Sequence, residues 1–469
     1  MTACILSVTV RNRPGVLARV SDLFAHSGTN IDRMTVGEIR NPSLSRMRIE
    51  ARLDEARLKN IIGCLQRMQD VLDIRTFQSR SRAFAYWSVV YGLFVTILGL
   101  NLATPLYAVY KAQWGLTPGI ITLVFAAYAL AVIPSIVLFG QLSDRIGYRK
   151  LLMAGAVAAL SGSACMALAD GLPLLLLART LQGLSVGLFN GIAVSAMTAL
   201  HRNKDRQRSA FLAAAAVTAG NALGPVMSGA LAQFGPWPTQ LPYLAHIALV
   251  LLGLACLLVS RSAPRKSGGP RLHWPAIPRR LLMPFLLSAV TSFIAWAVIS
   301  LFMSIIPSYM GEWIGTSSLL ISGVTSASVL AVSAASQLIF GRLSPEKMAL
   351  AGFVLLLGGL ISLVLAIHAG SGILLAASVL FTGLGHGPLY AGSLALTNNM
   401  APEQSRGDLI SSYYAVTYLG VALPVMGLGL LAQRLGLESA IGGFVLALVC
   451  VSAVGMWGWS MLNKWRKPV

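Results

Sequence analysis

Residues 79–110 read SRSRAFAYWSVVYGLFVTILGLNLATPLYAVY, and this stretch decides the fold. After Arg80 and Arg82 come apolar and aromatic residues, with no charged side chain before Lys111. A helix needs about 20 apolar residues to cross the roughly 30 Å of hydrocarbon in a bilayer. Near residue 83, therefore, a charge-rich soluble segment gives way to a membrane-spanning one.

The same pattern continues along the chain. Hydrophobic residues make up 56% of the sequence and charged residues only 11%, whereas a soluble domain carries about 25% charge. The predicted fold class is an all-α membrane protein behind a small soluble head. We predict twelve spanning helices, at 84–110, 119–140, 150–169, 172–198, 208–232, 241–260, 281–308, 317–340, 347–368, 371–397, 408–432 and 438–462.

Basic residues in the links predict the orientation, because they stay on the cytoplasmic side. Of the 36 Lys and Arg, 14 precede residue 83, which leaves 22. Nineteen of these lie in the even-numbered links or the tail, Lys111 and Arg434 lie on the other side, and Arg179 is within a span. Both termini are therefore expected in the cytoplasm, with the spans in the inner membrane. The net charge of +20 then faces anionic lipid headgroups, so no nucleic-acid partner is expected.

The longest link, 261–280, is rich in Pro, Gly and basic residues and separates six spans from six. Two halves around a midplane site are typical of a transporter of small molecules, so an enzyme is not expected. The five cysteines are scattered without metal-ligand spacing, and neither a metal nor a cofactor is expected. The predicted domains are a head at 1–80, halves at 84–260 and 281–462, a linker at 261–280 and a basic tail at 463–469.

The link after span two reads Gly140-Gln141-Leu142-Ser143-Asp144-Arg145-Ile146-Gly147-Tyr148-Arg149-Lys150. This stretch resembles the signature of the major facilitator superfamily, whose fold is two six-helix pseudo-repeats. The resemblance implies a latch between the halves in the outward-open state, with Asp408 at the start of span eleven in the partner zone. A basic loop that only sets topology is the alternative. The latch residues would be Gly140, Asp144, Arg145, Gly147, Arg149 and Asp408.

Span four holds Arg179-Thr180-Leu181-Gln182-Gly183-Leu184-Ser185-Val186-Gly187, which resembles a second element of that family. A charged residue inside a membrane is expensive and is by default a functional hypothesis. In proton-coupled relatives the matching arginine is implicated in proton transfer; a structural arginine bonded to helix carbonyls is the alternative. Gly183 and Gly187 predict a helix-packing face.

Span five holds Gly220-Asn221-Ala222-Leu223-Gly224-Pro225-Val226-Met227-Ser228-Gly229, which resembles the family's "antiporter" motif. Within the family this element marks exporters more than importers, so efflux is favoured. A generic packing face of Gly220, Gly224, Pro225 and Gly229 is the alternative. No Asp or Glu lies well inside a predicted span, which leaves proton coupling open. The polar and aromatic residues of the spans favour a neutral or amphipathic solute (an amino acid, a metabolite or a drug) over a sugar phosphate, which would need several buried Arg or Lys.

Polar residues within the spans are the candidates for transport or coupling. Histidine titrates near neutral pH and can carry a proton, and His386 follows Gly383 and Gly385 in a segment where a broken helix could line a cavity. A histidine that only packs helices together is the alternative, and His246 raises the same question. The candidates are Asn101, Arg179, Gln182, Asn190, Asn221, His386 and Tyr414.

The head reads as β-α-β-β-α-β, with strands at 4–10, 30–39, 45–53 and 71–77 and helices at 15–27 and 54–68. We place Val16, Leu17, Val20, Leu23 and Phe24 on the inner face of the first helix. The order is that of a ferredoxin-like α+β domain.

Three segments then identify a family: Asn12-Arg13-Pro14-Gly15-Val16-Leu17, Gly28-Thr29-Asn30-Ile31-Asp32, and Leu44-Ser45-Arg46-Met47. They resemble the ACT domain of acetolactate synthase regulatory (small) subunits. The resemblance implies a branched-chain amino acid effector bound at a dimer interface, with Asn12, Gly15 and Asn30 as ligands, and an ACT-mediated homodimer. A helix cap at Asn12 and a turn at Gly15 are the alternative.

Two functions remain open. In the first, a secondary transporter is biased by an amino-acid-sensing head. In the second, the head is a membrane-tethered regulatory subunit that binds the acetolactate synthase catalytic subunit.

Overall fold

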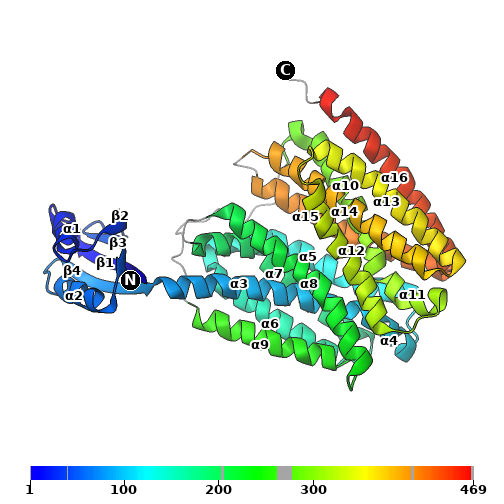
Figure 1. Cartoon of the computed structure of the whole chain (residues 1–469), viewed down its shortest axis with the longest axis horizontal. Helices are drawn as coiled ribbons and strands as arrows, with labels where there is room; N and C mark the ends of the chain where they lie inside the picture. Colours follow the sequence, from blue (N-terminus) through cyan, green and yellow to red (C-terminus); the bar gives the residue numbers. More distant parts are fainter. Residues whose placement is uncertain (1, 40, 202–204, 261–276, 403–405, 466–469) are drawn as a thin grey trace. The chain divides into compact units, whose positions relative to one another are not determined.

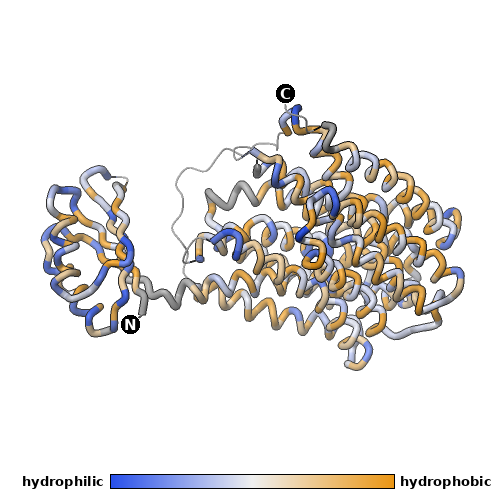
Figure 2. The backbone as a smooth tube through the Cα atoms, turned by 45° about the horizontal axis from the view of Figure 1, so that its top comes forward, coloured by the Kyte–Doolittle hydropathy of each residue, from blue (hydrophilic) through white to orange (hydrophobic). Residues whose placement is uncertain are grey.

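The computed structural model describes residues 2–39, 41–201, 205–260, 277–402 and 406–465. The chain forms two compact units, a head unit made mainly of Met1–Trp87 and a membrane unit that begins at Ser88. Figure 2 shows the difference between them, because hydrophilic and hydrophobic residues alternate along the head while the helices of the membrane unit are mostly hydrophobic.

The head unit has the predicted β-α-β-β-α-β order. Its four strands form one antiparallel sheet in the order β2-β3-β1-β4, so that β2 and β4 are the edge strands. The elements are β1 (Thr2–Arg11), α1 (Val16–His26), β2 (Ile31–Glu38), β3 (Leu44–Leu53), α2 (Glu55–Gln66) and β4 (Val71–Gln78).

The core of the head lies between the sheet and its two helices. Leu6, Val8 and Ile49 from the sheet pack with Val20 and Phe24 of α1, all fully buried. One predicted core residue is wrong: Leu17 is 45% exposed. It lies on nearly the same face as the buried Phe24, but two turns earlier, in the first turn of α1. Cys4 is buried as well, and burial raises the pKa of its thiol.

The membrane unit holds twelve candidate spans, as predicted, built from fourteen α-helices among the described residues. Figure 1 shows them as one bundle. The elements are α3 (Ser79–Asn101), α4 (Ala103–Trp114), α5 (Pro118–Ile146), α6 (Tyr148–Ala167), α7 (Leu172–Leu200), α8 (Arg206–Phe234), α9 (Leu241–Val259), η1 (Arg279–Leu281), α10 (Leu282–Met303), α11 (Ile305–Ile314), α12 (Leu319–Phe340), α13 (Pro345–Ala369), α14 (Gly372–Met400), α15 (Arg406–Leu435) and α16 (Leu437–Trp465).

Two spans are broken in equivalent places. Span one breaks at Leu102, between α3 and α4, and span seven breaks at Ser304, between α10 and α11. A proline follows each break by three residues, Pro105 and Pro307. Proline cannot donate to the carbonyl four residues before it and its ring crowds that carbonyl. Each break therefore leaves backbone oxygens for side chains of other helices.

Candidate functional site

Arg179 of α7 lies at the centre of a buried polar cluster. It is 1% exposed, and its Nη1 donates to the carbonyl of Leu100 at 2.9 Å and to Oε1 of Gln182 at 2.7 Å. Its guanidinium carbon is 4.5 Å from the ring centroid of Tyr128. Arg179 and Gln182 thus lie together, and the arginine binds the chain next to the break in span one.

Side chains of α8 form hydrogen bonds with residues at the same break in span one. Asn101 Nδ2 donates to Oδ1 of Asn221 at 2.9 Å and to the carbonyl of Ile97 at 2.8 Å. Ser228 Oγ donates to the carbonyl of Leu102 at 2.6 Å. Sequence reasoning gave Ser228 no role, although Pro105 was a signal that carbonyls near residue 102 would need donors.

His246 of α9 has a structural role. Its Nδ1 lies 2.7 Å from Ser163 Oγ and its Nε2 lies 2.9 Å from the carbonyl of Val95. One neutral tautomer satisfies both contacts, with the hydroxyl donating to Nδ1 and Nε2–H donating to the carbonyl. Both ring nitrogens of His246 are therefore engaged in holding helices together.

His386 of α14 differs from His246. Its Nδ1 is 2.7 Å from Ser333 Oγ, but its buried Nε2 has no hydrogen-bond partner among the described residues, and neither does Nε1 of Trp296. The two rings meet edge to face at 5.2 Å between centroids, and Tyr390 stacks on the histidine at 5.8 Å. Tyr414, on α15, continues this aromatic cluster through Tyr413. The C-terminal half thus holds two buried ring nitrogens, His386 Nε2 and Trp296 Nε1, that have no hydrogen-bond partner among the described residues.

Asn190 of α7 meets the C-terminal half. Its Nδ2 donates to the Tyr418 hydroxyl of α15 at 3.3 Å. The half-buried polar and aromatic groups on the helices that face each other across the two halves include Asn190, Asn221, Trp296, Tyr390, Tyr414 and Tyr418.

The glycines of span four bring α7 against α5. A Cβ atom on Gly183 would lie 2.8 Å from Ala131 Cβ and closer still to the carbonyl of Tyr128. A Cβ on Gly187 would overlap Ser135. This close approach places Arg179, one turn before Gly183, next to Tyr128.

The glycines of span five serve two neighbours. Cβ atoms on Gly220 and Gly224 would lie 2.8 and 2.6 Å from carbonyls of α3, those of Phe94 and Leu98. A Cβ on Gly229 would lie 2.5 Å from the carbonyl of Leu319 in α12, and Gly323 of α12 packs on Pro225. Span five therefore contacts span one of its own half and span eight of the other.

The predicted latch is only partly described. The side chains of Gly140, Asp144 and Arg145 lie outside the described residues, so their role remains a prediction. Gly147 has φ 90°, which favours glycine, just before α6 begins. Arg149 Nε donates to the carbonyl of Leu257 at 3.0 Å, so in this conformation it caps the end of α9 within its own half. Asp408 lies in the first turn of α15, where the helix dipole favours an anion.

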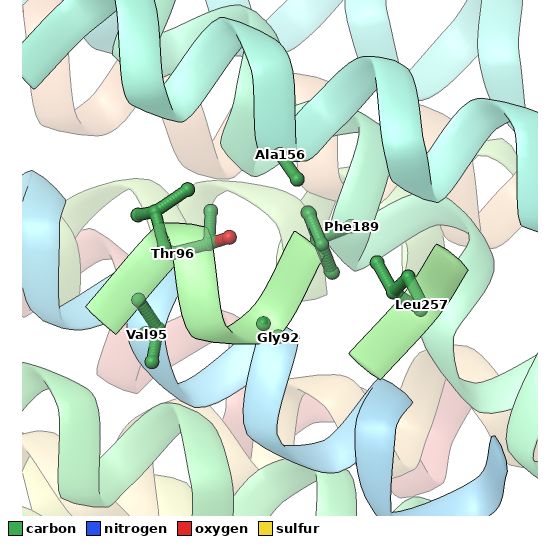
Figure 3. Close-up of a pocket in the computed structure, with 8 residues that line it drawn as sticks. Gly92, Val95, Thr96, Ala156, Phe189 and Leu257 are labelled. Atoms are coloured by element: carbon green, nitrogen blue, oxygen red, sulfur yellow. The ribbon is translucent and has the colours of Figure 1, made fainter. Parts of the chain in front are cut away.

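The N-terminal half also contains a small cavity, shown in Figure 3, between α3, α6, α7 and α9. Val95, Ala156, Phe189 and Leu257 contribute apolar walls and Thr96 a hydroxyl. It lies within one half and contains none of the predicted transport residues, so we do not assign it a substrate.

The head residues predicted to bind an effector are divided between the ends of the sheet. Asn12 Nδ2 donates to the carbonyl of Pro42 at 3.1 Å, and Gly15, at φ 83°, precedes α1 without a side-chain cap. Ile31 pairs with Ala51, and Ala51 pairs with Cys4. Asn30 is therefore level with the start of β1, whereas Asn12 follows its end. At about 3.3 Å per residue, roughly 25 Å separate the two asparagines.

Comparison with known families decides what this arrangement is. The profile described as Major Facilitator Superfamily matches residues 89–424 and 288–468. The chain belongs to the major facilitator superfamily. Residues 6–73 match the acetolactate synthase small-subunit-like ACT domain, so this superfamily member carries an ACT domain as its head.

Curated relatives match the two parts separately. The head is 42% identical over 74 residues to a probable acetolactate synthase small subunit of Methanothermobacter thermautotrophicus, covering 16% of this chain and 44% of that protein. The membrane part is 25% identical over 213 residues to the uncharacterized transporter YebQ of Escherichia coli, covering 45% and 46%. It is 34% identical over 146 residues to the multidrug efflux pump LfrA of Mycolicibacterium smegmatis, covering 30% and 28%. The chain spans less than half the length of these relatives.

Solved structures share the fold. A bacterial homolog of the human lysosomal transporter Spinster, inward-facing and unoccupied, superposes with a TM-score of 0.68 at 14% identity, over 83% of this chain and 99% of that one. A POT family transporter in complex with 5-aminolevulinic acid gives a TM-score of 0.67 at 14% identity, over 83% and 97%. Together with the family match and the twelve candidate spans, this makes the chain a multi-pass membrane protein of a transporter family.

Proposed function

We propose that this superfamily member is a secondary active exporter of a small neutral or amphipathic solute, located in the inner membrane with both termini in the cytoplasm. The observation that carries the export proposal is the Gly220–Gly229 segment of α8. It packs on span one with its first two glycines and on span eight with its last. The match to a multidrug efflux pump supports the same direction.

The chemistry of the facing helices supports the solute class. In the described spans, acidic side chains lie only at helix ends, such as Asp408, Glu346 and Glu438 in first turns. A buried carboxylate is what a cationic drug needs as a partner. The groups available instead are amides, phenols, the Trp296 indole and the His386 imidazole, which bind neutral acceptors and planar apolar bodies.

Everted membrane vesicles test this function. With a proton gradient imposed, vesicles that contain the chain should accumulate the neutral amphipathic dye N-phenylnaphthylamine and should not accumulate the cation ethidium. Vesicles without the chain are the baseline. The assay is repeated with a panel of neutral and zwitterionic compounds that includes the branched-chain amino acids. If the vesicles accumulate none of them, the result counts against export. Ethidium uptake would contradict the solute class.

We propose further that the ACT head binds a branched-chain amino acid between two copies of the chain. In one head, Asn12 and Asn30 are too far apart to touch one small ligand. Strand β2 is an edge strand, so it can pair with β2 of a second copy about a two-fold axis. Antiparallel pairing would bring Asn30 of one copy level with the end of the other at which Asn12 and Gly15 lie.

This two-chain site predicts complementation between variants. Titration calorimetry should show valine binding by the purified full chain and its loss in Asn12→Ala and in Asn30→Ala. A mixed dimer of the two variants should recover valine binding at one of its two sites, because one site then has both asparagines intact. If both residues served one chain, the mixed dimer would bind no valine.

The alternative, a tethered regulatory subunit, keeps the support of the 42% identity to a small subunit. Co-purification of the acetolactate synthase catalytic subunit with the full chain, lost on removal of residues 1–80, would favour it. The proposed linker at 261–280 lies largely outside the described residues.

A further inference from the structure

Spans five and eleven carry a repeated segment at a spacing of 200 residues. Gly229-Ala230-Leu231-Ala232-Gln233 ends span five, and Gly429-Leu430-Leu431-Ala432-Gln433 ends span eleven. A shared Pro-Val-Met precedes each, beginning at Pro225 and Pro424. These spans occupy equivalent positions in the two halves, and each reaches the end of the bundle that holds the odd-numbered links.

Gln233 of the N-terminal half forms hydrogen bonds with the start of span eight in the C-terminal half. Its Oε1 accepts hydrogen bonds from Ser318 Oγ at 2.7 Å and from the backbone N–H of Leu320 at 3.0 Å. Ser318 is the N-cap residue of α12 and also accepts from the N–H of Ile321. The glutamine therefore satisfies N–H and O–H donors that a helix start leaves open.

Gln433 makes the equivalent crossing from the C-terminal half. Its Nε2 donates to Thr117 Oγ1 at 2.7 Å, and Thr117 directly precedes α5, accepting from the N–H of Ile120. The repeated glycine packs alike on both sides. A Cβ on Gly229 would lie 2.5 Å from the carbonyl of Leu319, and one on Gly429 would lie 2.9 Å from that of Pro118. Each carbonyl belongs to the first residue of the facing helix.

A charged contact lies at the same end. Lys111 of α4 pairs with Glu312 of α11, and its Nζ sits 3.4 Å from the ring centroid of Tyr309. In the orientation proposed above, this end faces away from the cytoplasm. The contacts that join the two halves here thus include those of span five with eight, of span eleven with two, and of the tips of spans one and seven.

We propose that Gln233 and Gln433 form a two-point lock that holds the membrane unit closed on its outer side, and that the strength of this lock sets how often the transporter opens outward. The lock rests on the alternating access of the proposed transport. Both glutamines reach the N-cap hydroxyl of a helix in the other half, so an outward opening has to break both contacts.

Distances between two spin labels on the full chain, measured by double electron–electron resonance, test this lock. Spin labels at Gln113→Cys and Ser317→Cys, exposed positions in opposite halves, report the opening in a background without native cysteines. Gln433→Ala should raise the ratio of the long-distance to the short-distance population about fivefold, the typical net effect of one lost hydrogen bond, and Gln233→Ala, which loses two, should raise it at least as much. The double variant should raise the ratio by roughly the product of the two.

Gln240→Ala is the matched control. Gln240 lies in a link at the same end of the bundle, and its side chain contacts Thr239 within that link, so its replacement should leave the distances unchanged. An unaltered distribution in the double variant, or an equal shift in Gln240→Ala, would overturn the lock. Because the labels need no substrate, a failed export assay with shifted distances would reject the exporter and leave the lock standing.

Discussion

Replacing Arg179 with alanine is expected to lower the free energy of unfolding of the membrane unit by about 1–3 kcal/mol, the cost of leaving buried hydrogen-bond acceptors without their donor. The change leaves the Leu100 carbonyl and Gln182 Oε1 without their donor in a site closed to water. Thermal unfolding of the purified protein in detergent measures the effect.

Two further variants serve as controls for this prediction. Arg179→Lys should recover only part of the stability, because an ammonium lacks the forked geometry that reaches several acceptors at once. Arg434→Ala removes an exposed arginine at the end of α15 and should change little. Equal effects of Arg179→Ala and Arg434→Ala would show that the buried contacts contribute nothing.

Gly183→Ala and Gly427→Ala should shift stability in opposite directions. A methyl group on Gly183 has no room against α5, so helix α7 must move and stability should fall by about 1–3 kcal/mol. Around Gly427 of α15 nothing lies within 4 Å of the added carbon, and alanine is the better helix former by about 1 kcal/mol. Thermal unfolding of both variants and the wild type in the same detergent is the measurement.

The comparison is useful because the two substitutions are chemically identical. A fall in stability for both would mean that flexibility at glycine, and not close packing, is what these spans require. Gly183→Ala should also lower the transport rate, whereas Gly427→Ala should not. The reason is that Arg179 lies one turn from Gly183 and its position depends on the approach of α7 to α5.

Much of the fold could be predicted from sequence because it depends on patterns that persist over many residues. Length and hydropathy placed all twelve spans, and alternation in β1 and β3 placed the sheet. The breaks at Leu102 and Ser304 were missed, since a proline inside an apolar run leaves the hydropathy unchanged. Leu17 was misplaced because its neighbours Val16 and Val20 are equally apolar.

The candidate site was harder to predict, since its contacts join residues that are distant in sequence. Asn101 and Asn221 were both chosen as polar residues within spans, yet nothing in either span indicated that they bind each other. His246 and His386 looked alike in sequence, and only their neighbours distinguish them: Val95 satisfies the second nitrogen of one, and the second nitrogen of the other is left open. The head site needed strand register, which shows that Asn12 and Asn30 belong to opposite ends.

The equivalent breaks in spans one and seven have a mechanical consequence. Short helices α4 and α11 lie side by side, joined through Lys111 and Glu312, although α4 belongs to the N-terminal half and α11 to the C-terminal half (Figure 1). The halves can therefore part at this end only if α4 and α11 separate, so the Lys111–Glu312 contact has to break together with the Gln233 and Gln433 contacts. Because each short helix is already separated from its long helix by a break, α4 and α11 can tilt away from each other without bending a continuous helix.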